Sequence, residues 1–197
     1  MIRAILFDFG GVLAEEGFRE GLKTLARAQG LDPEKLFQEG MDAVYASGYV
    51  LGKGTEEDFW SLLKARTGLT GENQALREVV LSRFTLRPSM LSLVDELRGK
   101  GYIVGILSDQ TDWLDAIDRE TGLFRHFDRV FVSYRLGKGK RDPTLFDDVV
   151  RALGLAPQEV LFVDDNPENV AKARSRGLKA ILFTDEAELR RTLEALL

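Results

Sequence analysis

The stretch Ile5-Leu6-Phe7-Asp8-Phe9-Gly10-Gly11-Val12-Leu13 decides the fold class of this 197-residue chain. It continues an apolar run that begins at Ile2, and a short uninterrupted apolar run is typical of a strand buried on both faces of a parallel sheet. The run ends at a carboxylate, Asp8. Ligands of open α/β sheets bind beyond the carboxyl ends of the strands, so this carboxylate lies where chemistry is expected.

Four further apolar runs have the same character and are separated by helical patterns. Together with Ile2 to Phe7, the predicted strands are Tyr102 to Leu107, Val130 to Val132, Val160 to Val163 and Lys179 to Phe183. Two helix starts are marked by a capping side chain followed by proline, at Asp142-Pro143 and Asn166-Pro167. The alternation of strands and helices predicts an α/β fold, a Rossmann-like parallel sheet covered by helices on both faces.

One region, residues 15–86, breaks this alternation because it contains helical patterns and no convincing strand. One of its helices begins at Thr55, with Asp58 three residues on in the arrangement of a capping box. The pattern predicts two units. An α/β core comprises residues 1–14 and 87–197, and an all-helical domain is inserted after the first strand.

The composition excludes several kinds of active site. With no cysteine there is no disulfide framework, thiolate zinc site or cysteine nucleophile, and a single histidine cannot form a histidine metal cluster. Any metal must therefore be bound by oxygen atoms. The one histidine, His126, lies among apolar neighbours at what looks like the end of a helix, which disfavours a Ser-His-Asp triad.

Charge and hydropathy limit the partners. The 27 Lys and Arg residues against 32 Asp and Glu give a net charge of −5, spread along the chain without a basic cluster, so nucleic acid is not expected as a partner. No apolar stretch is long enough for a signal or a membrane span, so we expect a cytoplasmic protein without membrane contact. No feature of the sequence indicates an oligomeric state.

Polar residues follow the predicted strands at the edge where ligands of such sheets bind. They are Asp8, Ser108-Asp109, Lys140 and Asp164-Asp165-Asn166. Singly, each has a structural interpretation: Ser108 as the cap of a helix near Thr111, Lys140 as a solvated charge, and the aspartate pair as a helix N-terminal cluster. Because all four positions are predicted to meet at one sheet edge, a joint functional role explains them better than four coincidences.

Four segments carry a resemblance to a known family. They are Ile5 to Leu13, Gly105 to Ser108, Lys140 to Phe146 and Leu161 to Asn166. Their residues, order and strand contexts resemble the four motifs of the haloacid dehalogenase-like hydrolases, and the resemblance covers nearly the whole chain. The predicted helical insertion is similar to the small cap domain of many members, so the resemblance implies that residues 15–86 form a cap.

The resemblance implies a Mg²⁺-dependent phosphohydrolase that acts on a small phosphorylated metabolite. Asp8 would attack phosphorus and form an aspartyl-phosphate, and a carboxylate needs no deprotonation for this at pH 7. Ser108, Asp109 and Lys140 would bind the substrate. Ser108 and Lys140 would also act in catalysis, through a donated hydrogen bond and a fixed ammonium.

The implied metal site uses oxygen ligands only, as the composition requires. Mg²⁺ would be held by Asp8, Asp164 and the backbone carbonyl of Gly10, where it screens the repulsion between the nucleophile and the phosphate. Asp165 is either a second metal ligand, directly or through water, or the residue that orients Lys140.

Two residues depart from the family pattern. Gly10 stands where most phosphatases of the family carry an aspartate that protonates the leaving group, a contribution of about 10² to 10⁴-fold. The candidate replacements are Glu15, Glu16 and Asp109. Asp109 also stands where the family often has asparagine, and a carboxylate beside a phosphate costs energy unless it is protonated, paired or turned away.

These departures leave alternatives open. One is a catalytically weakened family member that binds a phosphate ligand as a regulatory module, and another is a dehalogenase-type hydrolase, for which the sequence offers no recognisable halide cradle. Aromatic and basic residues of the insertion are candidates for substrate specificity, although helical aromatics are more often core. They are Phe18, Arg19, Tyr45, Tyr49 and Trp60.

Overall fold

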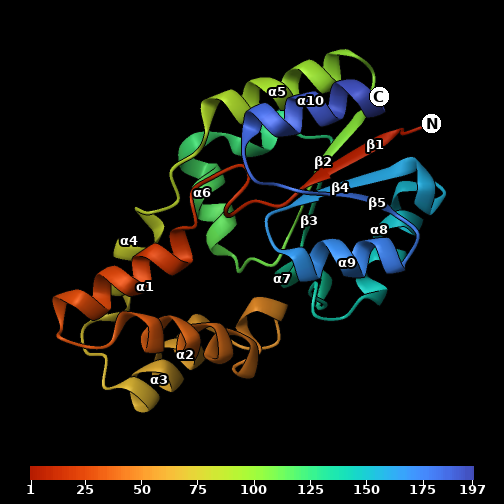
Figure 1. Cartoon of the computed structure of the whole chain (residues 1–197). Coiled ribbons are helices and arrows are strands. Elements are labelled where there is room, and N and C mark those ends of the chain that lie inside the picture. The colour runs from red at the N-terminus through yellow and green to blue at the C-terminus, as the bar shows by residue number, and fades with distance from the viewer.

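The structure, a computed structural model, describes residues 1–197 and contains a central sheet with helices on both faces (Figure 1). The five strands are β1 (Ala4–Phe7), β2 (Ile103–Ser108), β3 (Arg129–Val132), β4 (Val160–Asp164) and β5 (Lys179–Leu182). All are parallel, in the order β3-β2-β1-β4-β5. They coincide with the five predicted apolar runs to within two residues at each end, so the predicted α/β fold class is confirmed.

The central position of β1 brings the polar strand ends together. Leu6 lies opposite Gly105 of β2 and Phe162 of β4. Asp8, which follows β1, therefore lies between the ends of β2 and β4 at the middle of the C-terminal edge. Gly105 permits this close pairing, because a Cβ there would lie 2.9 Å from both a Leu6 methyl carbon and the Arg129 carbonyl oxygen.

Helices cover both faces of the sheet, and alternate strand residues are buried beneath each. α5 (Pro88–Gly99), α6 (Trp113–Thr121) and α10 (Glu186–Leu196) cover the face of Ile5 and Phe7, and α8 (Thr144–Leu153) and α9 (Pro167–Ser175) cover the face of Ala4 and Leu6. Because every residue of β1 is buried, its sequence shows no polar alternation. The short helices are α7 (Ser133–Leu136), η2 (Leu123–His126) and η3 (Pro157–Glu159).

The segment between β1 and α5 contains helices and no strand of the sheet, and we refer to residues 15–86 as the insertion. Its helices are α1 (Gly17–Ala28), α2 (Pro33–Ala46), the 3-10 helix η1 (Tyr49–Leu51), α3 (Glu56–Thr67) and α4 (Asn73–Leu81). α3 begins with the predicted capping box. The Thr55 hydroxyl accepts from the Asp58 backbone N–H at 3.1 Å, and the Asp58 carboxylate accepts from the Thr55 backbone N–H at 2.8 Å.

The insertion shares a hydrophobic core with one face of the sheet. The ring of Trp113, on α6, lies 5.9 Å from Trp60 and 6.1 Å from Phe59 of α3, measured between ring centres, and 6.0 Å from Tyr49 of η1. All four side chains are buried. Apolar packing of large rings therefore fixes α3 and η1 against the sheet-containing part of the molecule.

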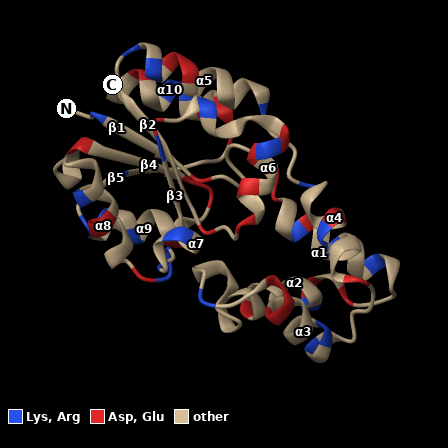
Figure 2. Cartoon of the chain, turned by 180° about the vertical axis from the view of Figure 1, so that it is seen from behind, with Lys and Arg blue, Asp and Glu red and all other residues tan.

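No helix combines the length and the apolar character that a membrane crossing needs. Figure 2 shows basic and acidic residues interspersed over the helices rather than sorted onto separate faces.

Candidate active site

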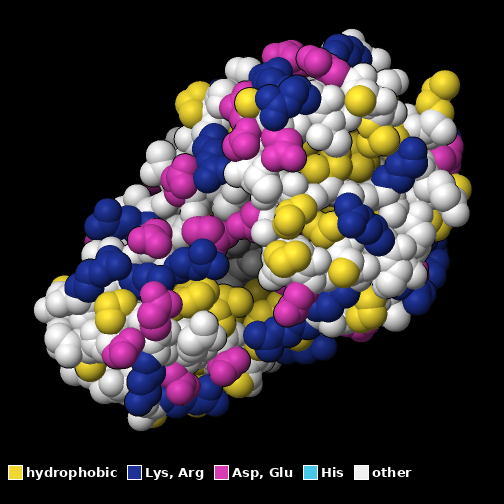
Figure 3. Space-filling view, viewed as in Figure 1, with side chains coloured by type: hydrophobic (Ala, Val, Ile, Leu, Met, Phe, Trp, Pro, Cys, Tyr) yellow, Lys and Arg dark blue, Asp and Glu magenta, His cyan; other side chains and the backbone are white.

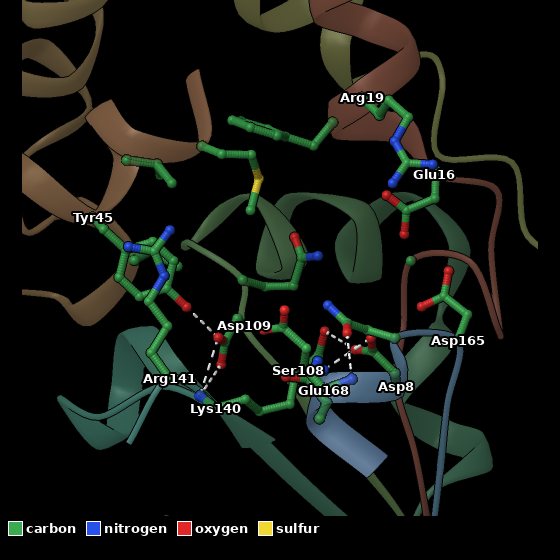
Figure 4. Close-up of a pocket in the computed structure, with 18 of the residues that line it drawn as sticks. Asp8, Glu16, Arg19, Tyr45, Ser108, Asp109, Lys140, Arg141, Asp165 and Glu168 are labelled. Carbon is green, nitrogen blue, oxygen red and sulfur yellow. Dashed lines mark hydrogen bonds and ion pairs between the residues drawn. The ribbon is translucent and has the colours of Figure 1, made fainter. Parts of the chain in front are cut away.

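A cavity of about 550 Å³ lies between the C-terminal ends of the strands and the insertion (Figures 3 and 4). Residues from the strand ends on its wall are Asp8, Gly10, Ser108, Asp109, Lys140, Arg141 and Asp165. Those from the insertion are Glu16, Phe18, Arg19, Phe37, Met41, Val44, Tyr45 and Val50. The structure thus brings the predicted nucleophile, metal ligands and substrate-binding residues of the strand ends to one place, with Asp164 buried directly behind the wall.

Asp8 is held by three donors and is 8% exposed. One carboxylate oxygen accepts from the Ser108 hydroxyl at 2.6 Å and the Phe9 backbone N–H at 2.8 Å, and the other lies 2.8 Å from the Lys140 ammonium. Burial raises the pKa of Asp8 well above its ordinary value, and the charge of Asp164 adds to this against the opposing charge of Lys140. A cation bound beside Asp8 would favour its ionised form.

Lys140 lies between two carboxylates. Its ammonium is 2.8 Å from Asp8 and 2.6 Å from Asp164, and the residue is 3% exposed. Although burial alone lowers the pKa of an ammonium, the charges of Asp8 and Asp164 raise the pKa of Lys140 above its ordinary value, so it stays charged. The interpretation of Lys140 as a solvated charge is therefore wrong. Asp8 and Asp164 orient it, rather than Asp165.

Three carboxylates converge beside this ammonium. Oxygen atoms of Asp8, Asp164 and Asp165 lie within 4.8 Å of one another. Asp164 is fully buried and accepts from the Asn166 backbone N–H at 2.7 Å, whereas Asp165 is half-buried on the cavity wall. Burial and the neighbouring Asp164 raise the pKa of Asp165. These three carboxylates are the residues that could together hold a metal ion.

The Ser108 hydroxyl faces Asp8 and caps no helix. It donates to Asp8, while the Thr111 hydroxyl accepts from the first backbone N–H of α6 at 3.2 Å. The interpretation of Ser108 as a helix cap is therefore wrong. His126 does not line the cavity and pairs with Asp95 at 2.9 Å, in keeping with the absence of a Ser-His-Asp triad.

The Glu16 carboxylate occupies the space that a side chain at position 10 would enter. A Cβ added to Gly10 would lie 3.0 Å from a Glu16 carboxylate oxygen, and so would a Cβ added to Gly11. Glu16 immediately precedes α1 and its carboxylate is directed into the cavity (Figure 4). Burial raises the pKa of Glu16, with a further contribution from the Asp165 charge, against the opposing charge of Arg19.

The other two candidate acids have partners. Glu15 is exposed, and its pKa is lowered by a hydrogen-bonded ion pair with Arg87 at 2.9 Å. Asp109 accepts from the Tyr45 hydroxyl and, at 2.9 and 3.1 Å, from the Lys140 backbone N–H. Asp109 is thus hydrogen-bonded to two neutral donors, which hold its carboxylate toward Tyr45 and the Lys140 backbone. Among the three candidates, Glu16 alone presents a free carboxylate to the cavity.

The specificity candidates divide into two groups. Those that line the cavity are Phe18, Arg19 and Tyr45. Tyr49 and Trp60 are 1% and 0% exposed and belong to the shared core, so their interpretation as substrate contacts is wrong. Three further residues line the cavity that the sequence did not single out: Phe37, Met41 and Arg141. Phe37 and Met41 lie on α2, and their sequence pattern does not distinguish them from core residues. The one signal for Arg141 is its position directly after Lys140.

We expect Lys140→Met to destabilise the metal-free protein by about 3–5 kcal/mol, because Asp8 and Asp164 lose their buried counter-charge. The loss grows with pH. A carboxyl whose pKa is raised by folding contributes stability at low pH, and this contribution disappears as the pH rises through the raised pKa. Denaturant unfolding at about pH 5 and about pH 8 measures the difference. The partly exposed Lys138→Met is the control, and equal stability of Lys140→Met and wild type at the higher pH contradicts the prediction.

Comparison with known proteins identifies the family. Residues 2–177 match the family model of the haloacid dehalogenase-like hydrolases. The chain is 30% identical over 204 residues to a phosphoserine phosphatase of Thermus thermophilus. The alignment covers 91% of this chain and 80% of that protein. It is 29% identical over 215 residues to the bifunctional epoxide hydrolase 2 of Rattus norvegicus, covering 98% of this chain but 38% of that longer protein.

A solved structure has the same fold. It is that of a HAD family enzyme from Bacteroides thetaiotaomicron in complex with magnesium and inorganic phosphate, with a TM-score of 0.76 and 23% identity over 96% of this chain and 99% of that one. The resemblance carried by the four motifs is therefore confirmed. This chain belongs to the haloacid dehalogenase-like hydrolases.

Proposed function

We propose that this hydrolase is a Mg²⁺-dependent phosphatase of a small phosphorylated metabolite, with Asp8 as the nucleophile. The observation that carries the proposal is the convergence of three aspartates, two of them paired with the Lys140 ammonium, at a cavity of metabolite size. The similarity to a phosphoserine phosphatase, and the common fold with an enzyme that holds magnesium and phosphate, support this class of reaction.

The residues present fit a hard divalent cation. Asp8, Asp164 and Asp165 offer carboxylate oxygens, and no backbone N–H donates to the carbonyl oxygen of Gly10. This set of oxygen donors, without nitrogen or sulfur, suits Mg²⁺. When bound there, Mg²⁺ supplies positive charge that offsets the repulsion between Asp8 and a phosphate dianion.

In the proposed reaction a carboxylate oxygen of Asp8 attacks phosphorus, and the bond from phosphorus to the leaving-group oxygen breaks. Glu16 gives its proton to that oxygen, and so takes the role of the aspartate that most phosphatases of the family carry where this chain has Gly10. Water then attacks the phosphorus of the aspartyl-phosphate, Glu16 takes a proton from it, and phosphate leaves with Asp8 restored. Lys140 and Ser108 hold Asp8 in position and stabilise negative charge around the phosphoryl group.

We also propose that residues 1–14 and 87–197 form the catalytic core and that the insertion acts as a cap. Its side chains on the cavity wall, among them Phe18, Arg19 and Phe37, are placed to exclude water and to contact the part of the substrate remote from the phosphate.

Removal of divalent metal is expected to lower phosphate release by about a thousandfold, because several kcal/mol of charge stabilisation is lost. Added Mg²⁺ should restore activity. It should also raise the melting temperature, since it binds carboxylates that converge only in the folded chain. Asp165→Asn is expected to shift both titrations to higher Mg²⁺, whereas Asp148→Asn, at a half-exposed position outside the cavity, should not. Chelated enzyme that stays fully active, with a melting temperature unaffected by Mg²⁺, contradicts the metal site.

A further inference from the structure

A single carboxylate joins the insertion to the backbone of Lys140. The Tyr45 hydroxyl, on α2, donates to Asp109, which directly follows β2. The same carboxylate accepts from the Lys140 backbone N–H at 2.9 and 3.1 Å (Figure 4). The Lys140 side chain in turn contacts Asp8 and Asp164. A chain of direct contacts therefore runs from α2 to the proposed nucleophile.

The surroundings of Tyr45 hold this arrangement in place. The Arg141 guanidinium lies over the Tyr45 ring, with its central carbon 3.6 Å from the ring centre. Gly139 leaves the space in which the two side chains meet, because a Cβ there would lie 3.0 Å from the Tyr45 hydroxyl and 3.0 and 3.1 Å from the Asp109 carboxylate oxygens. Burial raises the pKa of Tyr45 and Asp109 adds to the shift, so the hydroxyl keeps the proton that it donates.

A second tyrosine–aspartate pair joins the insertion to the core but does not reach the cavity. Tyr49 of η1 donates to Asp112, which precedes α6, and neither residue lines the cavity. Asp112 accepts no hydrogen bond from Lys140 or from the residues next to it. The chain therefore offers two similar contacts, of which one alone is connected to the catalytic charges.

We propose that Asp109 and Tyr45 are positioning residues, which couple the docking of α2 to the placement of Lys140 beside Asp8. This inference rests on the proposed function and replaces the expectation that Asp109 binds the substrate. Asp109 acts as a hydrogen-bond acceptor shared by the insertion and the core. The Lys140 ammonium takes its correct position beside Asp8 only when the Tyr45 hydroxyl donates to Asp109.

The first test compares Tyr45→Phe with the matched control Tyr49→Phe, each of which removes one hydroxyl. With Mg²⁺ and an activated aryl phosphate, we expect Tyr45→Phe to lower kcat by about tenfold or more, as for loss of a hydrogen bond to a charged group. Tyr49→Phe should change kcat less than about threefold, because its hydroxyl is not connected to Lys140. An equal effect of the two variants would make Tyr45 merely structural and overturn the proposal.

The second test separates hydrogen bonding by Asp109 from its charge. Asp109→Asn keeps an acceptor oxygen and is expected to retain most of kcat, while Asp109→Ala should lose as much as Tyr45→Phe. Adding Tyr45→Phe to Asp109→Ala should cause little further loss, since both remove the same contact. If Asp109→Asn is as damaging as Asp109→Ala, Asp109 acts through its charge and the proposal is wrong.

A third measurement is independent of turnover. Hydrogen exchange of the Lys140 backbone N–H, followed by NMR, is expected to be at least about tenfold faster in Tyr45→Phe than in Tyr49→Phe. Wild-type protein that releases no phosphate from any substrate would refute the proposed function, while exchange at Lys140 would still decide the coupling. Unchanged exchange in Tyr45→Phe overturns the coupling even in an active phosphatase.

Discussion

Asp8→Asn is expected to lower Mg²⁺-dependent phosphate release by at least about 10⁴-fold on every substrate, because an amide cannot form the aspartyl-phosphate. The fold should be retained. An asparagine oxygen can still accept from Ser108 and from the Phe9 backbone N–H, and Lys140 keeps Asp164 as its partner. Loss of one of two neighbouring buried carboxylates also removes repulsion, so the metal-free variant should melt no lower than the wild type.

The assay for Asp8→Asn measures phosphate release from phosphoserine, a set of sugar phosphates and an activated aryl phosphate, with Asp148→Asn as a surface control. Equal release by wild type and Asp8→Asn refutes a nucleophilic Asp8. Two other outcomes identify the alternatives raised by the sequence. Stabilisation by phosphate without turnover indicates a regulatory binding protein, and Asp8-dependent halide release from a 2-haloacid indicates a dehalogenase.

Glu16→Gln is expected to separate substrates by their leaving groups. The kcat/KM for alkyl phosphates should fall by about 10² to 10⁴-fold, because their alkoxide leaving groups need a proton. The kcat/KM for an activated aryl phosphate should fall less than about threefold, because it reports the attack by Asp8 and not the later hydrolysis of the aspartyl-phosphate. This role for Glu16 follows from its position, because one of its carboxylate oxygens lies 3.0 Å from the place that a Cβ at residue 10 would take. The ratio of kcat/KM between the two substrate types is the measurement.

The matched control for Glu16 is its neighbour Glu15, which is paired with Arg87 outside the cavity, so Glu15→Gln should leave the leaving-group dependence unchanged. Gly10→Asp provides a rescue. In the wild type it would crowd a second carboxylate against Glu16 and give no gain, but combined with Glu16→Gln it should restore activity on alkyl phosphates. If Glu16→Gln lowers kcat/KM equally for both substrate types, Glu16 is not the proton donor.

The sheet could be predicted from the sequence because its strands are buried on both faces. β1 is apolar at every position, and a run of this kind has few other structural explanations. The capping box at Thr55 was equally local, since both of its hydrogen bonds join residues three apart in the chain. The meeting of the strand ends followed from the rule for parallel sheets.

The details of the site depended on contacts that the sequence does not encode locally. Glu15 and Glu16 are adjacent and chemically alike, yet the entry into α1 turns one toward Arg87 and the other into the cavity. The hydrogen bonding of Asp109 depends on Tyr45, a residue 64 positions away in the chain. Tyr45 lies on a helix whose orientation no sequence motif predicts. Trp60 and Phe37 are both aromatic residues on helices of the insertion, and only packing decides which one is core.

The aromatic rings packed around Trp113 also limit how far the insertion can move away from the sheet. A wide swing of the insertion would expose Trp113, Trp60 and Phe59 to water, at a cost of roughly 2–6 kcal/mol for each ring. Opening of the cavity for ligand exchange is therefore expected to involve displacements of the insertion that are small enough to keep these rings in contact.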